Sequence, residues 1–178
     1  MLRIIGGAYR GRRINVGKGF ESRPTTDFAK EALFNILNNH FDFDQITVLD
    51  LFGGTGSISF EFASRGCGQI DVVDINNRAL KQISENAFLL GTKALHTVHL
   101  DTFKFIEICE RKYDVIFADP PYSSKNIEKI PGLIFQYQLL NKNGWFILEH
   151  SKNYNFSSYT NFTMSRNYGS VHFSFFGL

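Results

Sequence analysis

Apolar and polar positions alternate along the chain in a way that separates short strands from longer helices. Five apolar runs rich in β-branched and aromatic residues indicate buried strands, at residues 46–52, 69–73, 95–100, 113–118 and 145–149. Apolar positions at helical spacing lie between or before them, at about 26–39, 57–64, 77–90 and 127–139. This repeated alternation predicts an α/β fold in which helices cover both faces of a parallel sheet.

The two ends of the chain follow a different pattern. Residues 2–5 and 12–16 are predicted to form a short β-hairpin around a glycine-containing turn, and residues 161–168 and 170–176 a second hairpin broken at Gly169. We therefore expect a mostly parallel seven-stranded sheet with an antiparallel C-terminal strand and a small N-terminal β-hairpin. The sequence contains no repeat or linker, so residues 1–178 are interpreted as a single domain, with an extension at 1–22 and the core at 23–178.

Composition narrows the class of protein. The chain has 178 residues, 43% hydrophobic and 20% charged, which is ordinary for a globular domain. No apolar run approaches the roughly 20 residues that span a bilayer, and the N-terminus has no secretory apolar core. Cys67 and Cys109 are isolated, which argues against a disulfide framework or a zinc site. We expect a cytoplasmic protein with no metal and no membrane contact.

Charge is unevenly distributed along the chain. The net charge is only +2, but the first 23 residues carry six basic side chains and one acid, so this segment holds +5 and the remainder −3. Four of its arginines are Arg10, Arg12, Arg13 and Arg23. The planar guanidinium fork of arginine binds two phosphate oxygens at once. A polyanionic partner is therefore indicated, although a solvated basic tail would have the same composition.

The tetrapeptide Asp119-Pro120-Pro121-Tyr122 directly follows the predicted strand at 113–118. Two prolines end the strand and stiffen the chain where open α/β sheets bind their ligands. The Asp119 carboxylate and the Pro120 carbonyl can each accept an N–H from an amine conjugated to a ring, and Tyr122 can stack on that ring. The arrangement suits methylation of such an amine. The alternative is a structural turn with an Asp cap and a packed Tyr.

A glycine-rich turn, Gly53-Gly54-Thr55-Gly56, follows the first core strand. Glycines let the backbone approach a ligand closely, and the amides of the next helix face polar groups. Ser59 stands where a dinucleotide-binding motif has its third glycine, which favours a ligand without a pyrophosphate.

Four acids lie at or next to the ends of four successive predicted strands: Asp50, Asp74, Asp101 and Asp119. Asp74 is placed to bind ribose hydroxyls, Asp101 an adenine amine, and Asp50 a charged amino group. Each could instead cap a helix, but together the four acids describe a nucleoside pocket.

With both core motifs in place, the sequence resembles the RsmD family of S-adenosylmethionine-dependent methyltransferases, which act on guanine N2 of 16S ribosomal RNA. The basic hairpin and the motif Arg23-Pro24-Thr25-Thr26-Asp27 narrow the resemblance. It implies a Rossmann-like methyltransferase fold, a monomer, and a small ribosomal subunit or its assembly intermediate as substrate. The implied cofactor contacts are Asp50, Phe52, Gly53, Gly54, Gly56, Asp74 and Asp101. Asp119, Pro120 and Tyr122 would hold the guanine, and Arg10, Arg12, Arg13, Arg23 and Pro121 would face RNA.

Three alternatives remain open at this point. An adenine-N6 methyltransferase would use the same Asp-Pro-Pro-Tyr motif on a different amine. A non-catalytic RNA-binding assembly factor would be expected to have lost the glycines or carboxylates, all of which are present. An NAD-dependent oxidoreductase is disfavoured by Ser59.

The Arg-Pro-Thr-Thr-Asp segment lies either beside the active site or at the start of a well-capped connecting helix.

Overall fold

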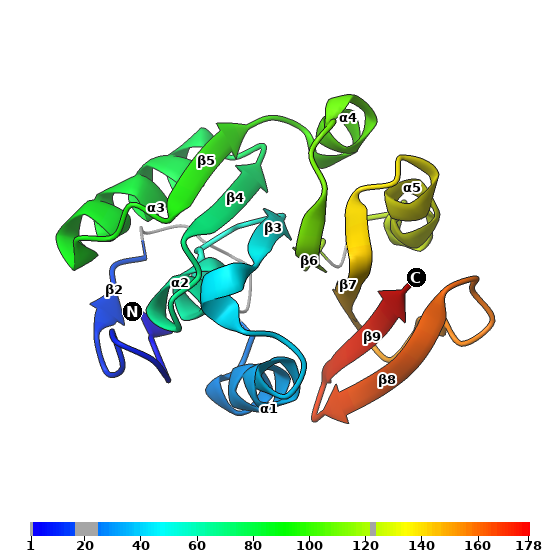
Figure 1. Ribbon diagram of the computed structural model, residues 1–178, viewed down its shortest axis with the longest axis horizontal. Coiled ribbons are helices and arrows are strands. Elements are labelled where there is room, and N and C mark those ends of the chain that lie inside the picture. Colours follow the sequence, from blue (N-terminus) through cyan, green and yellow to red (C-terminus); the bar gives the residue numbers. More distant parts are fainter. Residues whose placement is uncertain (1, 17–24, 122–123) are drawn as a thin grey trace.

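The chain folds around a twisted seven-stranded sheet (Figure 1). The computed structural model describes residues 2–16, 25–121 and 124–178. In spatial order the strands are β5 (Leu95–His99), β4 (Gln69–Asp74), β3 (Thr47–Leu51), β6 (Tyr113–Ala118), β7 (Leu140–His150), β9 (Val171–Gly177) and β8 (Phe162–Tyr168). The first five are parallel, and β9 pairs antiparallel to both β7 and β8. The predicted fold class is confirmed.

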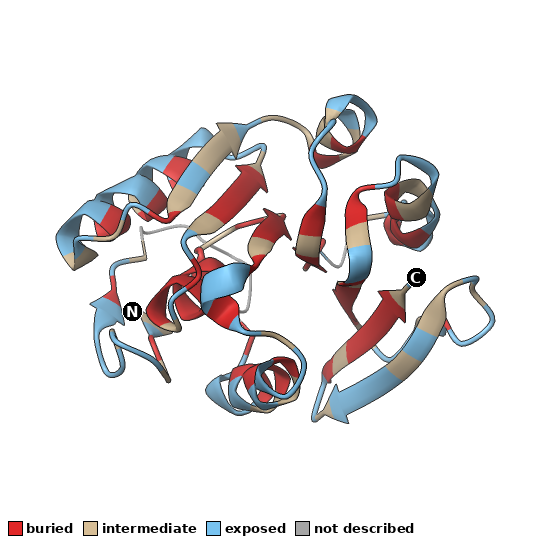
Figure 2. Cartoon of the chain, in the orientation of Figure 1, coloured by how far each residue is buried: buried red, intermediate tan, exposed pale blue. Residues whose placement is uncertain are grey.

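Helices cover both faces of this sheet, and each face has its own apolar core. The first core packs against α1 (Asp27–Asn38), α2 (Ser57–Ser64) and α3 (Asn77–Leu90), and the second against α4 (Thr102–Ile108) and α5 (Ile130–Gln136). Short 3-10 helices lie at Phe43–Gln45 and Ile127–Lys129. Figure 2 shows that the central strands and all of α2 are buried, whereas α3 is buried along one side. The parallel strands are apolar on both sides because both sides are covered.

Two elements differ from the predictions. Helix α4 was not predicted, and the helix expected over 127–139 ends at Gln136 because β7 begins at Leu140 rather than at residue 145. Asn143-Gly144, which has the sequence of a turn, forms an irregularity inside β7, with Asn143 at φ 65° and a register shift opposite Tyr113 and Val115. A Cβ on Gly144 would lie 2.9–3.1 Å from backbone oxygens. The glycine permits this close crossing of the chain.

The N-terminal hairpin is shorter than predicted and is fixed to the core. Its strands are β1 (Leu2–Arg3) and β2 (Arg13–Ile14), paired antiparallel. Ile4, which follows β1, and Ile14 of β2 are buried in the first core. The turn packs on the end of α2, where the amide of Ala8 donates to the Ser64 carbonyl (2.6 Å) and the amide of Tyr9 to the Ser64 hydroxyl (2.9 Å).

A buried ion cluster joins this hairpin to α1 and α2. The Lys30 ammonium, 1% exposed, donates to the Arg3 carbonyl (3.0 Å) and lies 3.3 Å from a carboxylate oxygen of Glu61, which is fully buried. Glu61 also pairs with Arg65 and accepts the amide of Ile5 (2.8 Å). Every charge in the cluster therefore has an opposite partner and hydrogen bonds, the condition under which buried charges are tolerated.

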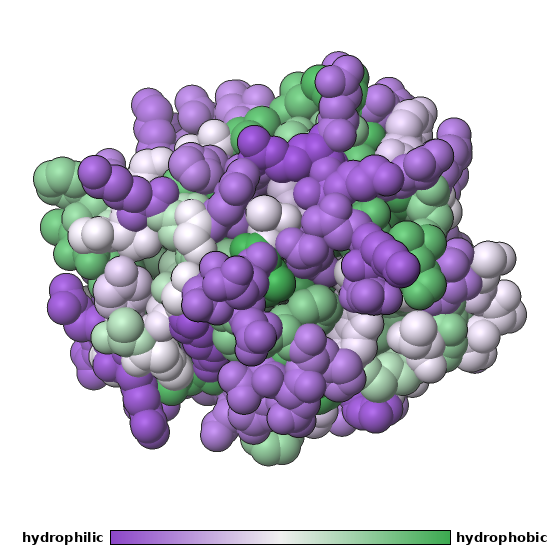
Figure 3. All heavy atoms as spheres, in the orientation of Figure 1, coloured by the Kyte–Doolittle hydropathy of each residue, from purple (hydrophilic) through white to green (hydrophobic). Residues whose placement is uncertain are grey.

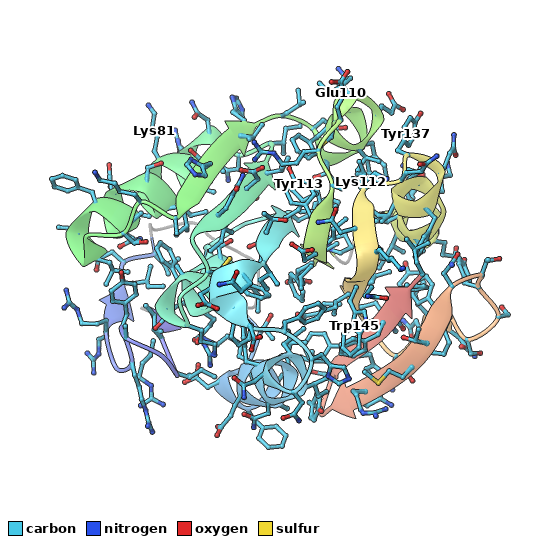
Figure 4. All side chains as sticks on the ribbon, viewed as in Figure 1. Lys81, Glu110, Lys112, Tyr113, Tyr137 and Trp145 are labelled. Carbon is cyan, nitrogen blue, oxygen red and sulfur yellow. The ribbon has the colours of Figure 1, made fainter. Side chains whose placement is uncertain are left out.

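Aromatic packing joins α1 to the sheet, and a few apolar side chains are exposed elsewhere on the surface. Trp145 of β7 packs against Phe41 after α1 and Phe175 of β9, which fixes the end of α1 to the sheet (Figure 4). Figure 3 shows apolar surface at the left edge, over the C-terminal end of α3, where Phe88 and Leu89 are exposed. Within the described ranges, no helix has the length and apolar character needed to cross a membrane.

Candidate active site at the carboxyl end of the sheet

Acidic side chains gather where β3, β6 and β7 end. The register pairs Leu51 with Ala118 and Ala118 with Leu148, so Asp119 and Glu149, one residue further on, leave neighbouring strands side by side. Side chains alternate between faces along a strand. Asp119 and Glu149 therefore share a face with Phe117 and Ile147, which belong to the core under α1 and α2. Asp50, paired with Phe117, lies on the same face.

The turn between β3 and α2 brings the backbone close to β4 and α3. Phe52, Gly54 and Gly56 all have positive φ, at 65°, 52° and 75°. A Cβ on Gly53 would lie 2.3 Å from Val72 Cγ1, and one on Gly56 would lie 2.9 Å from Ile83 and Phe60. Glycine is required at these points, and no side chain caps the first turn of α2. The amides of Gly53, Gly54 and Gly56 already donate within the protein, so the amides that could face a ligand are those in the first turn of α2.

Asp74, at the end of β4, holds this turn in place. One carboxylate oxygen accepts the Gly54 amide and the other the Asn76 amide, both at 2.7 Å. Asn76 in turn caps α3 by accepting the amides of Arg78 and Ala79. The structure thus places the predicted ribose-binding acid directly against the glycine turn.

Asp101 caps a helix, which the sequence left open as an alternative for each strand-end acid. Its carboxylate accepts the Lys104 amide (3.1 Å) at the start of α4. Phe103, in the first turn of that helix, lies edge-on to Phe52 with ring centroids 6.5 Å apart. Phe52, another predicted contact of the cofactor, therefore lies between the glycine turn and α4.

Asp50 is only 2% exposed, and the hydroxyl of Ser59 donates a hydrogen bond to its carboxylate. Burial raises the pKa of Asp50 from 3.8 to about 7, the nearby charge of Asp74 adds to the rise, and the Ser59 hydrogen bond opposes it. Ser59, the residue that replaces the third glycine of a dinucleotide motif, thus has a definite partner in this fold.

Asp119 and Pro120 present acceptors that have no partner among the described residues. Asp119 is half-buried and Pro120 buried, and no described group donates to the Asp119 carboxylate or the Pro120 carbonyl. Burial, followed by the charges of Glu149 and Asp50, raises the pKa of Asp119 well above its usual value. Pro121 is exposed, and its carbonyl accepts the Ser124 amide (2.8 Å) in a tight turn. Tyr122 lies outside the described residues.

Sequence reasoning did not single out Glu149, which the structure places against Thr25 of the Arg-Pro-Thr-Thr-Asp segment. Glu149 is 4% exposed, and the Thr25 hydroxyl donates to its Oε2 at 2.7 Å. Burial raises the pKa of Glu149 to about 7 against the lowering effect of this hydrogen bond. The available signal was its position as an acid at the end of the predicted strand 145–149. Thr26 caps α1 through the Ala29 amide (3.2 Å), so the Thr pair both caps the helix and contacts the site.

The predicted RNA-binding arginines lie apart from the acids. Arg10, Arg12 and Arg13 are exposed on the hairpin, and Arg23 lies outside the described residues. His150 is buried between the Ser174 hydroxyl and the Ser151 carbonyl, each 2.8 Å from a ring nitrogen, which supports a structural role. Across the described ranges, no group of three or more His, Cys, Asp or Glu side chains could hold a metal ion.

The strand order, the glycine turn after the first core strand and the Asp-Pro-Pro segment after the fourth define a Rossmann-like methyltransferase fold. A putative methyltransferase of Escherichia coli, yhhF, has this fold: its structure superposes with a TM-score of 0.86 and 23% identity, covering 98% of this chain and 96% of that one. The family described as Conserved hypothetical protein 95 matches residues 2–177, and the chain belongs to this family.

Curated relatives agree with the resemblance to the RsmD family, which is confirmed. The putative rRNA methyltransferase YlbH of Bacillus subtilis is 32% identical over 155 residues, covering 85% of this chain and 83% of the relative. The ribosomal RNA small subunit methyltransferase D of Escherichia coli K12 is 30% identical over 144 residues, covering 81% of this chain and 69% of the relative.

Proposed function

We propose that the protein uses S-adenosylmethionine to methylate the exocyclic N2 amine of a guanine in 16S ribosomal RNA, within the small subunit or its assembly intermediate. One observation carries the proposal. At the carboxyl end of β6, the Asp119 carboxylate and the Pro120 carbonyl are held rigidly beside the glycine turn, with no described donor to satisfy them. Buried acceptors are normally paired, so this pair indicates a ligand with N–H groups.

The residues around the glycine turn fit S-adenosylmethionine. That cofactor supplies a methyl group on a positively charged sulfonium. Asp50 and Glu149 are buried and Asp119 is half-buried beside them, and no described Lys or Arg forms an ion pair with any of the three. Their raised pKa values express the cost of that arrangement, which a cationic ligand would relieve. The open backbone at Gly54 and the carboxylate of Asp74 suit the uncharged remainder of a nucleoside.

In the proposed reaction the protein acts mainly by positioning. Asp119 and Pro120 each accept one hydrogen of the guanine amine, which turns the nitrogen lone pair toward the methyl group. The nitrogen–carbon bond would then form as the carbon–sulfur bond of the cofactor breaks, leaving a neutral thioether. The nitrogen would become positively charged and acidic, and its proton would pass to the Asp119 carboxylate or to water. Correct alignment of two reactants supplies several kcal/mol of the acceleration, so no strong base is required. The guanine enters the pocket after leaving its stack.

Ribosomal RNA is supported as the substrate by the relatives and by the hairpin. The relatives from B. subtilis and E. coli are named as ribosomal RNA methyltransferases, one of them for the small subunit. Exposed arginines at 10, 12 and 13 lie on a hairpin that is hydrogen-bonded to α2. A rigid basic surface suits a phosphate backbone because little conformational entropy is lost on binding.

Methyl transfer to small subunits from cells that lack the protein tests the proposal. Radiolabelled S-adenosylmethionine is added with the subunits, with naked ribosomal RNA or with duplex DNA, and the product is digested to nucleosides. N2-methylguanosine from the subunits is the expected product. N6-methyladenosine as the product would show that the target base is adenine and not guanine. No transfer to any substrate despite tight cofactor binding would refute an enzymatic role.

The variant Asp119→Ala ties this activity to the site. We expect it to abolish turnover while S-adenosylmethionine affinity, measured by calorimetry, stays within a few-fold of wild type. Asp44→Ala, which removes an exposed acid far from the strand ends, serves as the matched control. Wild-type turnover in Asp119→Ala would contradict the assigned role.

A further inference from the structure

Glu149 completes an acidic pair that the Asp-Pro-Pro motif alone does not contain. Asp119 and Glu149 directly follow the paired residues Ala118 and Leu148 of β6 and β7. Neighbouring strands are about 4.8 Å apart, and residues level with one another point to the same face. Two carboxyl groups from rigid strand ends therefore meet at the position where the proposed guanine amine would be held.

One oxygen of Glu149 is fixed and the other is available. Oε2 accepts the Thr25 hydroxyl at 2.7 Å, which orients the carboxyl group. No described residue donates to Oε1, and only 4% of the surface of Glu149 is exposed. No described Lys or Arg pairs with it either. A carboxyl group that is oriented at one oxygen and has no described donor at the other has the properties of a ligand-binding group.

The two purines differ at the atom next to the reacting amine. In guanine the N2 amine neighbours N1, which carries a hydrogen, so this edge presents two adjacent donors. In adenine the N6 amine neighbours an N1 that has only a lone pair. Two acceptors placed side by side match the guanine edge, whereas a carboxylate facing adenine N1 would set acceptor against acceptor.

We propose that Glu149 is a specificity-determining residue that accepts the N1–H of guanine while Asp119 and Pro120 hold the N2 amine. The inference rests on the proposed function and names the group that selects guanine over adenine. Thr25 acts as a positioning residue, because it touches the carboxyl group and not the base. The Thr25–Glu149 hydrogen bond thereby gives the Arg-Pro-Thr-Thr-Asp segment a role in base selection.

The electrostatics of the pair agree with this role. Burial raises the pKa of Glu149 to about 7, and Asp119 and Glu149 repel one another when both are ionised. An N–H donor stabilises the ionised form of a buried carboxyl group. A base with two donors therefore favours the charged pair, whereas a base with one donor leaves one carboxylate unsatisfied.

Two nucleosides that differ mainly at the N1–C6 edge provide the test. Guanosine and 2-aminopurine riboside both carry the 2-amine, but 2-aminopurine has no hydrogen on N1. Each is used as a competitive inhibitor of methyl transfer to small subunits by wild-type protein, Glu149→Gln and Thr25→Val. Inosine, which keeps N1–H and O6 but lacks the amine, measures the contribution of the amine. The analogue 6-O-methylguanosine, which keeps the amine and the oxygen on C6 but has no hydrogen on N1, separates recognition of N1–H from the loss of that oxygen. Glu31→Gln, an exposed acid on α1, is the matched control.

We expect wild-type protein and Glu31→Gln to prefer guanosine to 2-aminopurine riboside by about tenfold or more, the size of a hydrogen bond to a charged group. Glu149→Gln should lose most of this preference, and Thr25→Val part of it. Cofactor affinity and thermal melting confirm that each variant is folded and binds its cofactor. A Glu149→Gln protein that keeps the wild-type preference, or a wild-type protein that does not distinguish the two nucleosides, would overturn the inference.

Failure of this inference can be told apart from failure of the proposed function. If wild-type protein makes N2-methylguanosine but Glu149→Gln retains the same nucleoside preference, only the role of Glu149 is wrong. If wild-type protein transfers no methyl group to any RNA, the proposed function is wrong and the role of Glu149 falls with it.

Discussion

Replacing Asp50 by Asn is expected to stabilise the ligand-free protein at neutral and alkaline pH while weakening its affinity for S-adenosylmethionine. Asp50 is 2% exposed, and its carboxylate receives one hydrogen bond, from Ser59. Burial and the charge of Asp74 raise its pKa from 3.8 to about 7. An asparagine keeps a carbonyl oxygen for the Ser59 hydroxyl but has no charge to bury.

The size and sign of the effect follow from the pKa. Because the folded value lies above the unfolded one, the folded protein binds the proton more tightly, and unfolding releases it. The stability that this proton supplies is complete below about pH 4 and is lost as the pH rises through 7. A shift of about three units corresponds to about 4 kcal/mol. Asparagine does not titrate, so the variant should gain up to about 4 kcal/mol over wild type at pH 8.

At low pH the two proteins should converge or change order. Protonated aspartic acid and asparagine have similar shapes, and an unpaired amide N–H would cost the variant about 1 kcal/mol. Urea unfolding at pH 4.5, 6 and 8 measures the difference at each pH, and Asp44→Asn provides a control with an exposed acid. A difference between Asp50→Asn and wild type that does not change with pH would refute the reasoning. Calorimetry with S-adenosylmethionine then shows whether the stabilising change costs cofactor affinity.

Two further predictions concern the hairpin and the cluster beneath it. Arg10→Glu combined with Arg12→Glu should weaken binding to small subunits. The logarithm of the binding constant should also depend less steeply on the logarithm of the salt concentration, because fewer counterions are released. An unchanged slope in a filter-binding titration would contradict the RNA-binding role. Lys30→Met should lower the free energy of unfolding by about 3 kcal/mol, because it removes the ammonium that pairs with Glu61 in the interior. The control Lys81→Met, at an exposed position of α3, should change the free energy of unfolding little. A loss below 1 kcal/mol for Lys30→Met in urea unfolding would show that Arg65 alone satisfies Glu61.

The pattern of apolar runs was sufficient to predict the sheet because its central strands are buried on both faces. The same logic explains why α4 was missed. Its sequence, Thr102–Ile108, has apolar residues at 103, 105, 106 and 108, a mixed spacing that is typical of neither a strand nor a helix. The helix is seven residues long, too short for helical periodicity to emerge, and it is started by the Asp101 cap.

Sequence reasoning identified candidate residues that lie next to a strand end, and it did not identify a residue whose position depends on the packing of distant segments. Asp50, Asp74 and Asp119 were found from their positions after apolar runs, and the structure places them around one turn. Glu149 has the same position on β7, but its significance comes from Thr25, 124 residues earlier in the chain. No periodicity or local motif reports a contact across that separation.

The segment that follows Pro24 connects the hairpin to the acids. Thr25 donates to Glu149, and two residues later Asp27 pairs with Arg3 of β1 at 3.3 Å. One turn into α1, Lys30 holds the carbonyl of the same Arg3 at 3.0 Å. The hairpin proposed to bind RNA and the carboxyl group proposed to read guanine are thus both fixed to the start of one helix. Because both contacts exist before any substrate is bound, little ordering of the hairpin and of Glu149 remains when RNA binds.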